Sequence, residues 1–201
     1  MYSVEAMAKL GSAIVLVALI AMAVATLPRL FGDKPTGSEN LIGRKPPQFA
    51  APLTTGSSDK VANITQLSEP HPKSRPACSV NLPGVFNSCK VGRRPLVIAF
   101  WANNGAVCLN QIDAFNRAAK KSPEVVFVAV GIDQKREDAA AIAMRRGWTL
   151  PVAVDPDGAV SAIYSVAGCP STFFVNNGRI SAVKLGRIGP AALKVQLKKV
   201  R

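Results

Sequence analysis

Two continuous apolar runs lie in the central part of the chain, at residues 96–101 and 125–132. Runs of this length without a polar break are typical of strands buried on both faces, as in a parallel sheet. Residues 106–120 and the alanine-rich residues 136–146 have the composition and spacing of helices, and Gly147 follows as a stop signal. The pattern therefore predicts a β-α-β-α unit at the centre of the chain.

The last quarter of the chain carries turn and hairpin signals. Residues 155–158 (Asp-Pro-Asp-Gly) predict a turn followed by a short helix. Residues 172–175 and 179–185 flank Asn176-Asn177-Gly178, which is a strong hairpin signal, and Pro190 stands where a final helix begins. This order predicts an α/β fold in which helices flank a central mixed sheet. Periodicity alone leaves several folds of this class open.

The N-terminal region contains an uncharged apolar run, residues 10–27. As a helix at ~1.5 Å per residue it spans roughly 27 Å, about one hydrocarbon core. We interpret residues 1–30 as a signal-anchor, followed by a flexible linker at 31–45 and a folded domain at 46–201. The alternative is a cleaved signal peptide, because Ala23-Val24-Ala25 has the form of a cleavage site. Both interpretations carry the domain across the membrane and predict an extracytoplasmic location, at the cell membrane as a single-pass protein if the segment is retained.

The chain is strongly basic, with 25 Lys and Arg against 12 Asp and Glu and a net charge of +13. Beyond Asp157 it has no acidic residue. This region favours contact with an anionic surface, and the alternative is an ordinary solvated face. Nucleic acid is not an expected partner, because an extracytoplasmic domain seldom meets it and no aromatic-rich binding signature is present. The seven basic residues of this region are Arg179, Lys184, Arg187, Lys194, Lys198, Lys199 and Arg201.

Four segments together resemble the membrane-anchored thioredoxin-like proteins of the TlpA and ResA type and the wider AhpC/TSA-related redoxins. They are Pro46–Phe49, Phe100–Cys108, Val128–Asp133 and Val166–Val175. The resemblance covers residues 46 to about 198 and implies a thioredoxin-like sandwich. It also implies that Pro170 is the cis-proline that faces the active-site cysteines in that family.

The chain departs from the family where the chemistry takes place. Thioredoxin-like enzymes place a nucleophilic cysteine at a helix N-terminus, where the dipole lowers the thiol pKa, and a second cysteine one turn later resolves the mixed disulfide. Here Gly105 stands in the place of the first cysteine, and only Cys108 remains of the pair. If Pro170 is cis, Cys169 lies in the loop packed against the start of the helix that carries Cys108.

Three interpretations of Cys108 and Cys169 remain open. The two thiols are inert core residues, they form a structural or redox-active disulfide, or Cys108 acts alone as in a single-cysteine peroxidase. The peroxidase interpretation rests on the Thr-x-x-Cys motif of peroxiredoxins. The cysteine of that motif corresponds to Cys108, and its threonine is replaced here by Gly105. We favour Cys108 and Cys169 as the redox centre, with Trp101, Gly105 and Pro170 on the substrate-binding surface.

Two functions follow from this assignment. The first is a thiol-disulfide oxidoreductase that acts on extracytoplasmic protein thiols or disulfides. The second is a non-catalytic binding module that holds an extended polypeptide beside the cis-proline without disulfide exchange. The distance between the two sulfurs discriminates between these functions.

Cys78 and Cys89 belong to a segment at about 70–94 that looks inserted relative to short family members. An even number of cysteines outside the cytoplasm favours oxidation, so we predict a structural disulfide, with a second redox pair as the alternative. Closing a loop of this size stabilises the fold by about 3 kcal/mol on the chain-entropy model.

No cofactor is expected. No metal site is expected either, because His71 is the only histidine and no cluster has ligand spacing.

Overall fold

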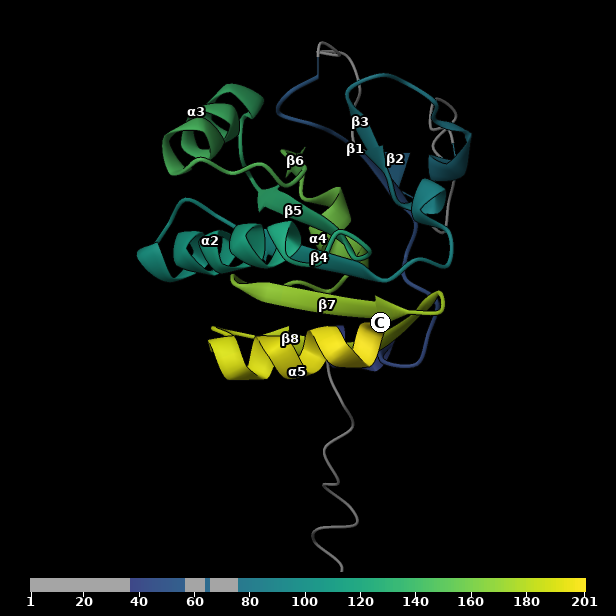
Figure 1. Ribbon diagram of the computed structural model, residues 1–201. Coiled ribbons are helices and arrows are strands. Elements are labelled where there is room, and N and C mark those ends of the chain that lie inside the picture. The colour runs from purple at the N-terminus through teal and green to yellow at the C-terminus, as the bar shows by residue number, and fades with distance from the viewer. Residues whose placement is uncertain (1–36, 57–63, 66–75) are drawn as a thin grey trace, which may run out of the picture. The chain divides into compact units, whose positions relative to one another are not determined.

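A five-stranded mixed sheet with the order β6-β5-β4-β7-β8 lies at the centre of the structure (Figure 1). The computed structural model describes residues 37–56, 64–65 and 76–201. Strands β4, β5 and β6 are parallel, whereas β7 runs antiparallel to both β4 and β8. The strands of this sheet are β4 (Leu96–Trp101), β5 (Val126–Ile132), β6 (Val152–Asp155), β7 (Ser171–Asn176) and β8 (Arg179–Leu185).

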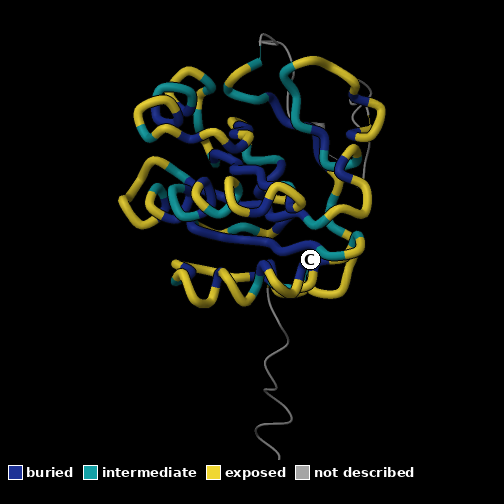
Figure 2. Tube along the Cα trace, in the orientation of Figure 1, coloured by how far each residue is buried: buried dark blue, intermediate teal, exposed yellow. Residues whose placement is uncertain are grey.

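Helices cover both faces of this sheet, and its strands alternate their side chains between two cores. Val97, Ala99 and Trp101 of β4 pack with α2, α3 and α5, whereas Ile98 and Phe100 pack with α4 and with β1 of a smaller sheet. Figure 2 shows the buried strands in dark blue between helices with exposed outer sides. The helices are α2 (Ala106–Lys120), α3 (Arg136–Arg146), α4 (Ala159–Ile163) and α5 (Pro190–Val200).

The smaller sheet has three antiparallel strands in the order β2-β1-β3. It joins the rest of the domain beside β6, where the Thr54 N–H donates to the Val152 carbonyl at 2.9 Å. Gly56 and Gly84 approach closely here, since a Cβ at Gly56 would lie 2.3 Å from the Gly84 Cα, so this contact requires glycine. The strands are β1 (Phe49–Pro52), β2 (Ile64–Thr65) and β3 (Val85–Asn87), and three 3₁₀ turns are η1 (Gly37–Leu41), η2 (Ala77–Ser79) and η3 (Ser88–Val91).

A disulfide joins Cys78 in η2 to Cys89 in η3, with a Cα–Cα distance of 5.3 Å. The buried side chain of Asn87 organises this loop: its amide donates to the carbonyls of Ala77 and Val80, and its oxygen accepts from the Cys89 N–H at 2.9 Å. The described part of the predicted insertion at about 70–94 is thus built into the smaller sheet through β3.

The predicted elements of the larger sheet are confirmed closely. β4, α2, α3 and β8 have the predicted bounds, and Gly147 ends α3 in a left-handed conformation with φ 63°. One strand was not predicted: β6 follows α3 and pairs in parallel with β5 at the edge of the sheet. The correct order is therefore β-α-β-α-β-α followed by the hairpin and the last helix.

The predicted signal-anchor and residues 31–36 of the predicted linker, together with His71, lie outside the described residues. The rest of the predicted linker, residues 37–45, is part of the folded domain: it contains η1, and the Gly43 N–H donates to the Ile180 carbonyl of β8 at 2.7 Å. Within the described ranges, no helix is long and apolar enough to cross a membrane. The same ranges contain no group of three or more His, Cys, Asp or Glu residues that could hold a metal ion.

Candidate redox site

Cys108 and Cys169 are joined by a disulfide, with an S–S distance of 1.99 Å and a Cα–Cα distance of 5.6 Å. Cys108 is the third residue of α2, and Cys169 immediately precedes Pro170, whose peptide bond is cis. The two sulfurs are 61 residues apart in sequence and meet because α2 begins where β4 ends, next to the start of the antiparallel β7. Of the three interpretations left open by the sequence, the structure therefore contains the disulfide.

Gly105 is the residue that precedes α2, and no side chain caps this helix. The amide groups of the first turn have no partner within the helix, and the dipole makes this end partially positive, so it stabilises an anion at Cys108. Gly105 is exposed and extended, with φ 171°, and a Cβ added there would meet no atom within 4 Å. The space that a cysteine would occupy in a Cys-x-x-Cys site is thus open.

The loop that carries Cys169 is held on both sides by hydrogen bonds. The hydroxyl of Ser171 donates to the Gly168 carbonyl at 2.6 Å, and the Gly186 N–H donates to the Pro170 carbonyl at 2.8 Å. Pro170 itself is buried, whereas Gly168 is exposed. The loop therefore has a fixed inner side and presents its outer side to solvent.

The two sulfur-bearing residues differ in accessibility. Cys108 is 4% exposed, whereas Cys169 is intermediate in exposure. The side-chain oxygen of the exposed Asn104 lies 3.3 Å from the Cys169 sulfur and 3.8 Å from the Cys108 sulfur. Neither sulfur carries a proton in the disulfide, so after reduction this oxygen is placed to accept a hydrogen bond from a thiol.

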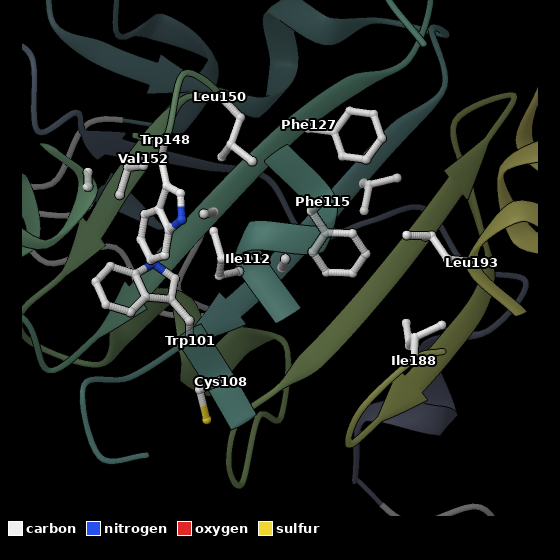
Figure 3. Close-up of a cluster of buried hydrophobic side chains, with 14 of the residues drawn as sticks. Trp101, Cys108, Ile112, Phe115, Phe127, Trp148, Leu150, Val152, Ile188 and Leu193 are labelled. Carbon is white, nitrogen blue, oxygen red and sulfur yellow. The ribbon is translucent and has the colours of Figure 1, made fainter. Parts of the chain in front are cut away.

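Trp101 lies beneath the site and is fully buried. Its ring packs edge-on against Trp148, with the centroids 5.1 Å apart, and Figure 3 shows its nitrogen on the edge that faces the second ring. This N–H has no hydrogen-bond acceptor among the described residues and is oriented for a weak N–H···π contact. Because no part of Trp101 is exposed, it supports the site from within the core and forms no part of its surface.

An ion pair on the far side of Trp148 connects this core to α2. Asp113 accepts hydrogen bonds from the Trp148 indole at 2.7 Å and from two Arg146 nitrogens at 3.1 and 2.6 Å. Burial raises the pKa of Asp113, but these hydrogen bonds and the charge of Arg146 outweigh it and hold the pKa below its ordinary value. No local sequence pattern predicts this network.

Gln111, one turn after Cys108, anchors the segment that leads into α5. It is 2% exposed, and its side-chain oxygen accepts from the Ile188 N–H at 2.7 Å. A buried polar residue on the apolar face of the predicted helix was the available signal for this role.

The second disulfide lies at the opposite end of the larger sheet. Cys89 precedes the start of β4, whereas Cys108 follows its end, and the six residues of β4 span roughly 20 Å at about 3.3 Å each. The structure therefore brings Cys108, Cys169, Gly105 and Pro170 together and keeps Cys78–Cys89 apart from them.

A mixed sheet flanked by helices, with a helix N-terminus that meets a cis-proline loop at the end of its central strand, is typical of the thioredoxin-like fold. Residues 84–183 match the model of the AhpC/TSA family. No curated protein matches the sequence.

Solved structures agree on the fold. A putative thiol:disulfide interchange protein DsbE from Chlorobium tepidum is 24% identical, with a TM-score of 0.61 over 79% of this chain and 96% of its own. A secreted Mycobacterium tuberculosis disulfide oxidoreductase is 18% identical, with a TM-score of 0.54 over 58% of this chain and 90% of its own. StoA from Bacillus subtilis is 19% identical, with a TM-score of 0.50 over 57% and 89%. The predicted thioredoxin-like fold is thereby confirmed.

Proposed function

We propose that the protein is a thiol-disulfide oxidoreductase whose redox centre is the Cys108–Cys169 pair. The observation that carries this proposal is a disulfide with one buried sulfur at a helix N-terminus and one more accessible sulfur in the cis-proline loop. Attack on the accessible sulfur expels the other as a thiolate, and a helix N-terminus is where a protein stabilises a thiolate best. The positions of the attacked and leaving sulfurs thus fit disulfide exchange.

The exchange proceeds in two balanced steps. A substrate thiolate attacks the Cys169 sulfur, the S–S bond breaks, and its electron pair leaves on Cys108, which gives a mixed disulfide between substrate and Cys169. A second substrate thiolate then attacks the substrate sulfur of this mixed disulfide and releases Cys169 as a thiolate. The substrate gains a disulfide, and the protein gains two electrons, and two protons once both thiolates are protonated. The same steps in reverse reduce a substrate disulfide.

The two roles of a Cys-x-x-Cys site are kept, but the first is moved from the helix N-terminus to the cis-proline loop. The accessible sulfur that contacts the substrate is supplied by Cys169 in place of the missing cysteine at position 105, and Cys108 keeps the part of the resolving thiol. Asn104 contacts both sulfurs and accepts a hydrogen bond from whichever thiol is protonated in the reduced state. Gly105 and Gly168 are exposed beside the disulfide and add no side chains to that surface.

The proposed location is extracytoplasmic, with residues 1–30 as a membrane anchor. The uncharged run at 10–27 and two disulfides among four cysteines support it, because disulfides persist outside the cytoplasm. A reporter that is active only after export, fused behind Arg201, is expected to be active. Activity of a cytoplasm-restricted reporter alone would contradict this location.

Single serine variants test the redox proposal. Cys108→Ser leaves the accessible thiol of Cys169 and should trap a mixed disulfide with a peptide disulfide, detected as a mass increase. Cys169→Ser leaves the buried thiol of Cys108 and should react at least about tenfold more slowly, because local opening has to precede attack. Cys78→Ser, which frees a thiol far from the site, is the matched control.

Three results would contradict the proposal. Equal trapping rates for Cys108→Ser and Cys169→Ser would contradict the assignment of Cys169 as the attacked sulfur and Cys108 as the leaving sulfur. Oxidation of a dithiol peptide by the wild-type protein no faster than by the double serine variant would favour the non-catalytic binding module. Consumption of hydroperoxide that is lost in Cys108→Ser, without any disulfide exchange, would favour the peroxidase.

A further inference from the structure

A groove of about 500 Å³ runs between α2 and α5. The two helices run in the same direction, because Gln111 accepts from the Ile188 N–H at one end and Arg201 donates to the Ser122 hydroxyl at the other. The floor of the groove is apolar and is lined by Ala114, Ala118, Leu193 and Leu197. The two leucines are only 6% and 7% exposed, so the apolar floor is recessed.

Both rims of this groove carry cations at helical spacing. Arg117 and Lys121 of the α2 segment stand four residues apart, as do Lys194 and Lys198 of α5, so each pair lies on one face of its helix. All four are exposed, and none makes a salt bridge with a residue that the structure describes. No acidic residue lines the groove, and its fifth cation, Arg201, is paired with Glu124.

We propose that this groove docks an acidic amphipathic helix of a partner protein. Such a helix places apolar side chains on the recessed floor and carboxylates at i and i+4 beside both rows of cations. Electrostatic complementarity of this kind speeds association and fixes the orientation of the partner.

The distribution of the groove's features favours this occupant over other anions. A single anionic headgroup would use one end of the groove and leave the second row of cations without a counterpart. A uniform polyanion would not use the apolar floor. A flat membrane surface would be met best by protruding apolar side chains, whereas Leu193 and Leu197 are recessed.

The groove is separate from the disulfide but lies on the same helix. Arg117 and Lys121 follow Cys108 by nine and thirteen residues, which is roughly 14 to 20 Å along a helix axis. Neither Cys108 nor Cys169 lines the groove. The docking surface goes beyond the proposed redox function, because binding there needs no sulfur chemistry and is measured without it.

Binding of a synthetic helical peptide tests the proposal. The peptide carries leucines on one face and glutamates on both flanks, and fluorescence anisotropy measures its Kd for the oxidised full chain in phosphatidylcholine nanodiscs. Lys121→Glu/Lys198→Glu should raise the Kd at least tenfold. The matched control Lys120→Glu/Lys199→Glu makes the same charge change at adjacent exposed positions outside the groove and should raise it less than threefold. A peptide with glutamine in place of leucine should bind at least tenfold more weakly.

Each alternative occupant predicts a different result. Equal losses for the groove and control variants would overturn the proposal in favour of a diffuse basic surface. Equal binding of the glutamine peptide would identify a polyanion site. Groove-dependent binding of phosphatidylglycerol vesicles without binding of the peptide would identify a membrane surface. If the glutamate variant does not fold, Lys121→Gln/Lys198→Gln provides the same comparison against Lys120→Gln/Lys199→Gln.

Discussion

Breaking the Cys108–Cys169 disulfide is expected to weaken the fold by a predictable amount. The bond closes a loop of 61 residues, for which the chain-entropy relation gives about 4 kcal/mol of stabilisation. In the reduced wild-type protein, the helix dipole stabilises a Cys108 thiolate at the start of α2 by up to about 1 kcal/mol. This stabilisation offsets part of the loss. The free energy of unfolding should therefore fall by about 4 kcal/mol in Cys108→Ser/Cys169→Ser and by about 3 kcal/mol after selective reduction of the wild type.

Urea denaturation followed by tryptophan fluorescence measures both values, because the only two tryptophans of the chain, Trp101 and Trp148, pack together beneath the site. With a slope near 2 kcal/mol per molar, the double variant should unfold at a urea concentration lower by about 2 M. A double variant as stable as the wild type would refute the loop-closure reasoning. One that cannot fold at all would show that the bond is a structural requirement, and a reversible redox role would then be excluded.

Two further predictions concern Gly105, beside the disulfide, and Asp113, farther along α2. Gly105→Cys meets no steric obstacle and should create Cys-x-x-Cys activity in an insulin-reduction assay, and activity no greater than that of the wild type would contradict the site assignment. Asp113→Asn should lower the free energy of unfolding by about 1 to 2 kcal/mol at pH 7 in urea titrations. The pKa of Asp113 is lower in the folded state, so its contribution is complete above the unfolded value near pH 4 and is lost as the pH falls through the folded value. A difference from wild type that does not shrink as the pH falls below 4 would contradict this.

Long segments with a single strong pattern were predictable from the sequence. β4 is a six-residue apolar run, and α2 is a fifteen-residue helix with one buried face. β6 was missed because it has only four residues, Val152–Asp155, between a proline and a turn signal. Its strand conformation depends on pairing with β5 and with the chain near Leu53, and both contacts are tertiary. The groove between α2 and α5 was unpredictable for the same reason.

The candidate site was predictable where a local motif determined the geometry. Cys169 directly precedes Pro170, so the family resemblance alone located its sulfur near the start of the helix that carries Cys108. The partners of Asp113 lie 33 and 35 residues away, on α3 and just after it, and no local pattern links them. Trp101 was expected at the surface because it adjoins the motif, but its place as the last residue of a fully buried strand puts it in the core.

The position of the disulfide bears on its reversibility. In a Cys-x-x-Cys site both sulfurs belong to one turn of a helix. Here one sulfur belongs to α2 and the other to the loop that precedes β7. Reduction would separate them if the bond alone held that loop, but β7 pairs with β4 from Ser171 to Val175, and the Gly186 N–H holds the Pro170 carbonyl. Cys169 therefore stays beside Cys108 after the bond breaks. A dithiol kept in this arrangement closes again at little entropic cost, as a reversible redox centre requires.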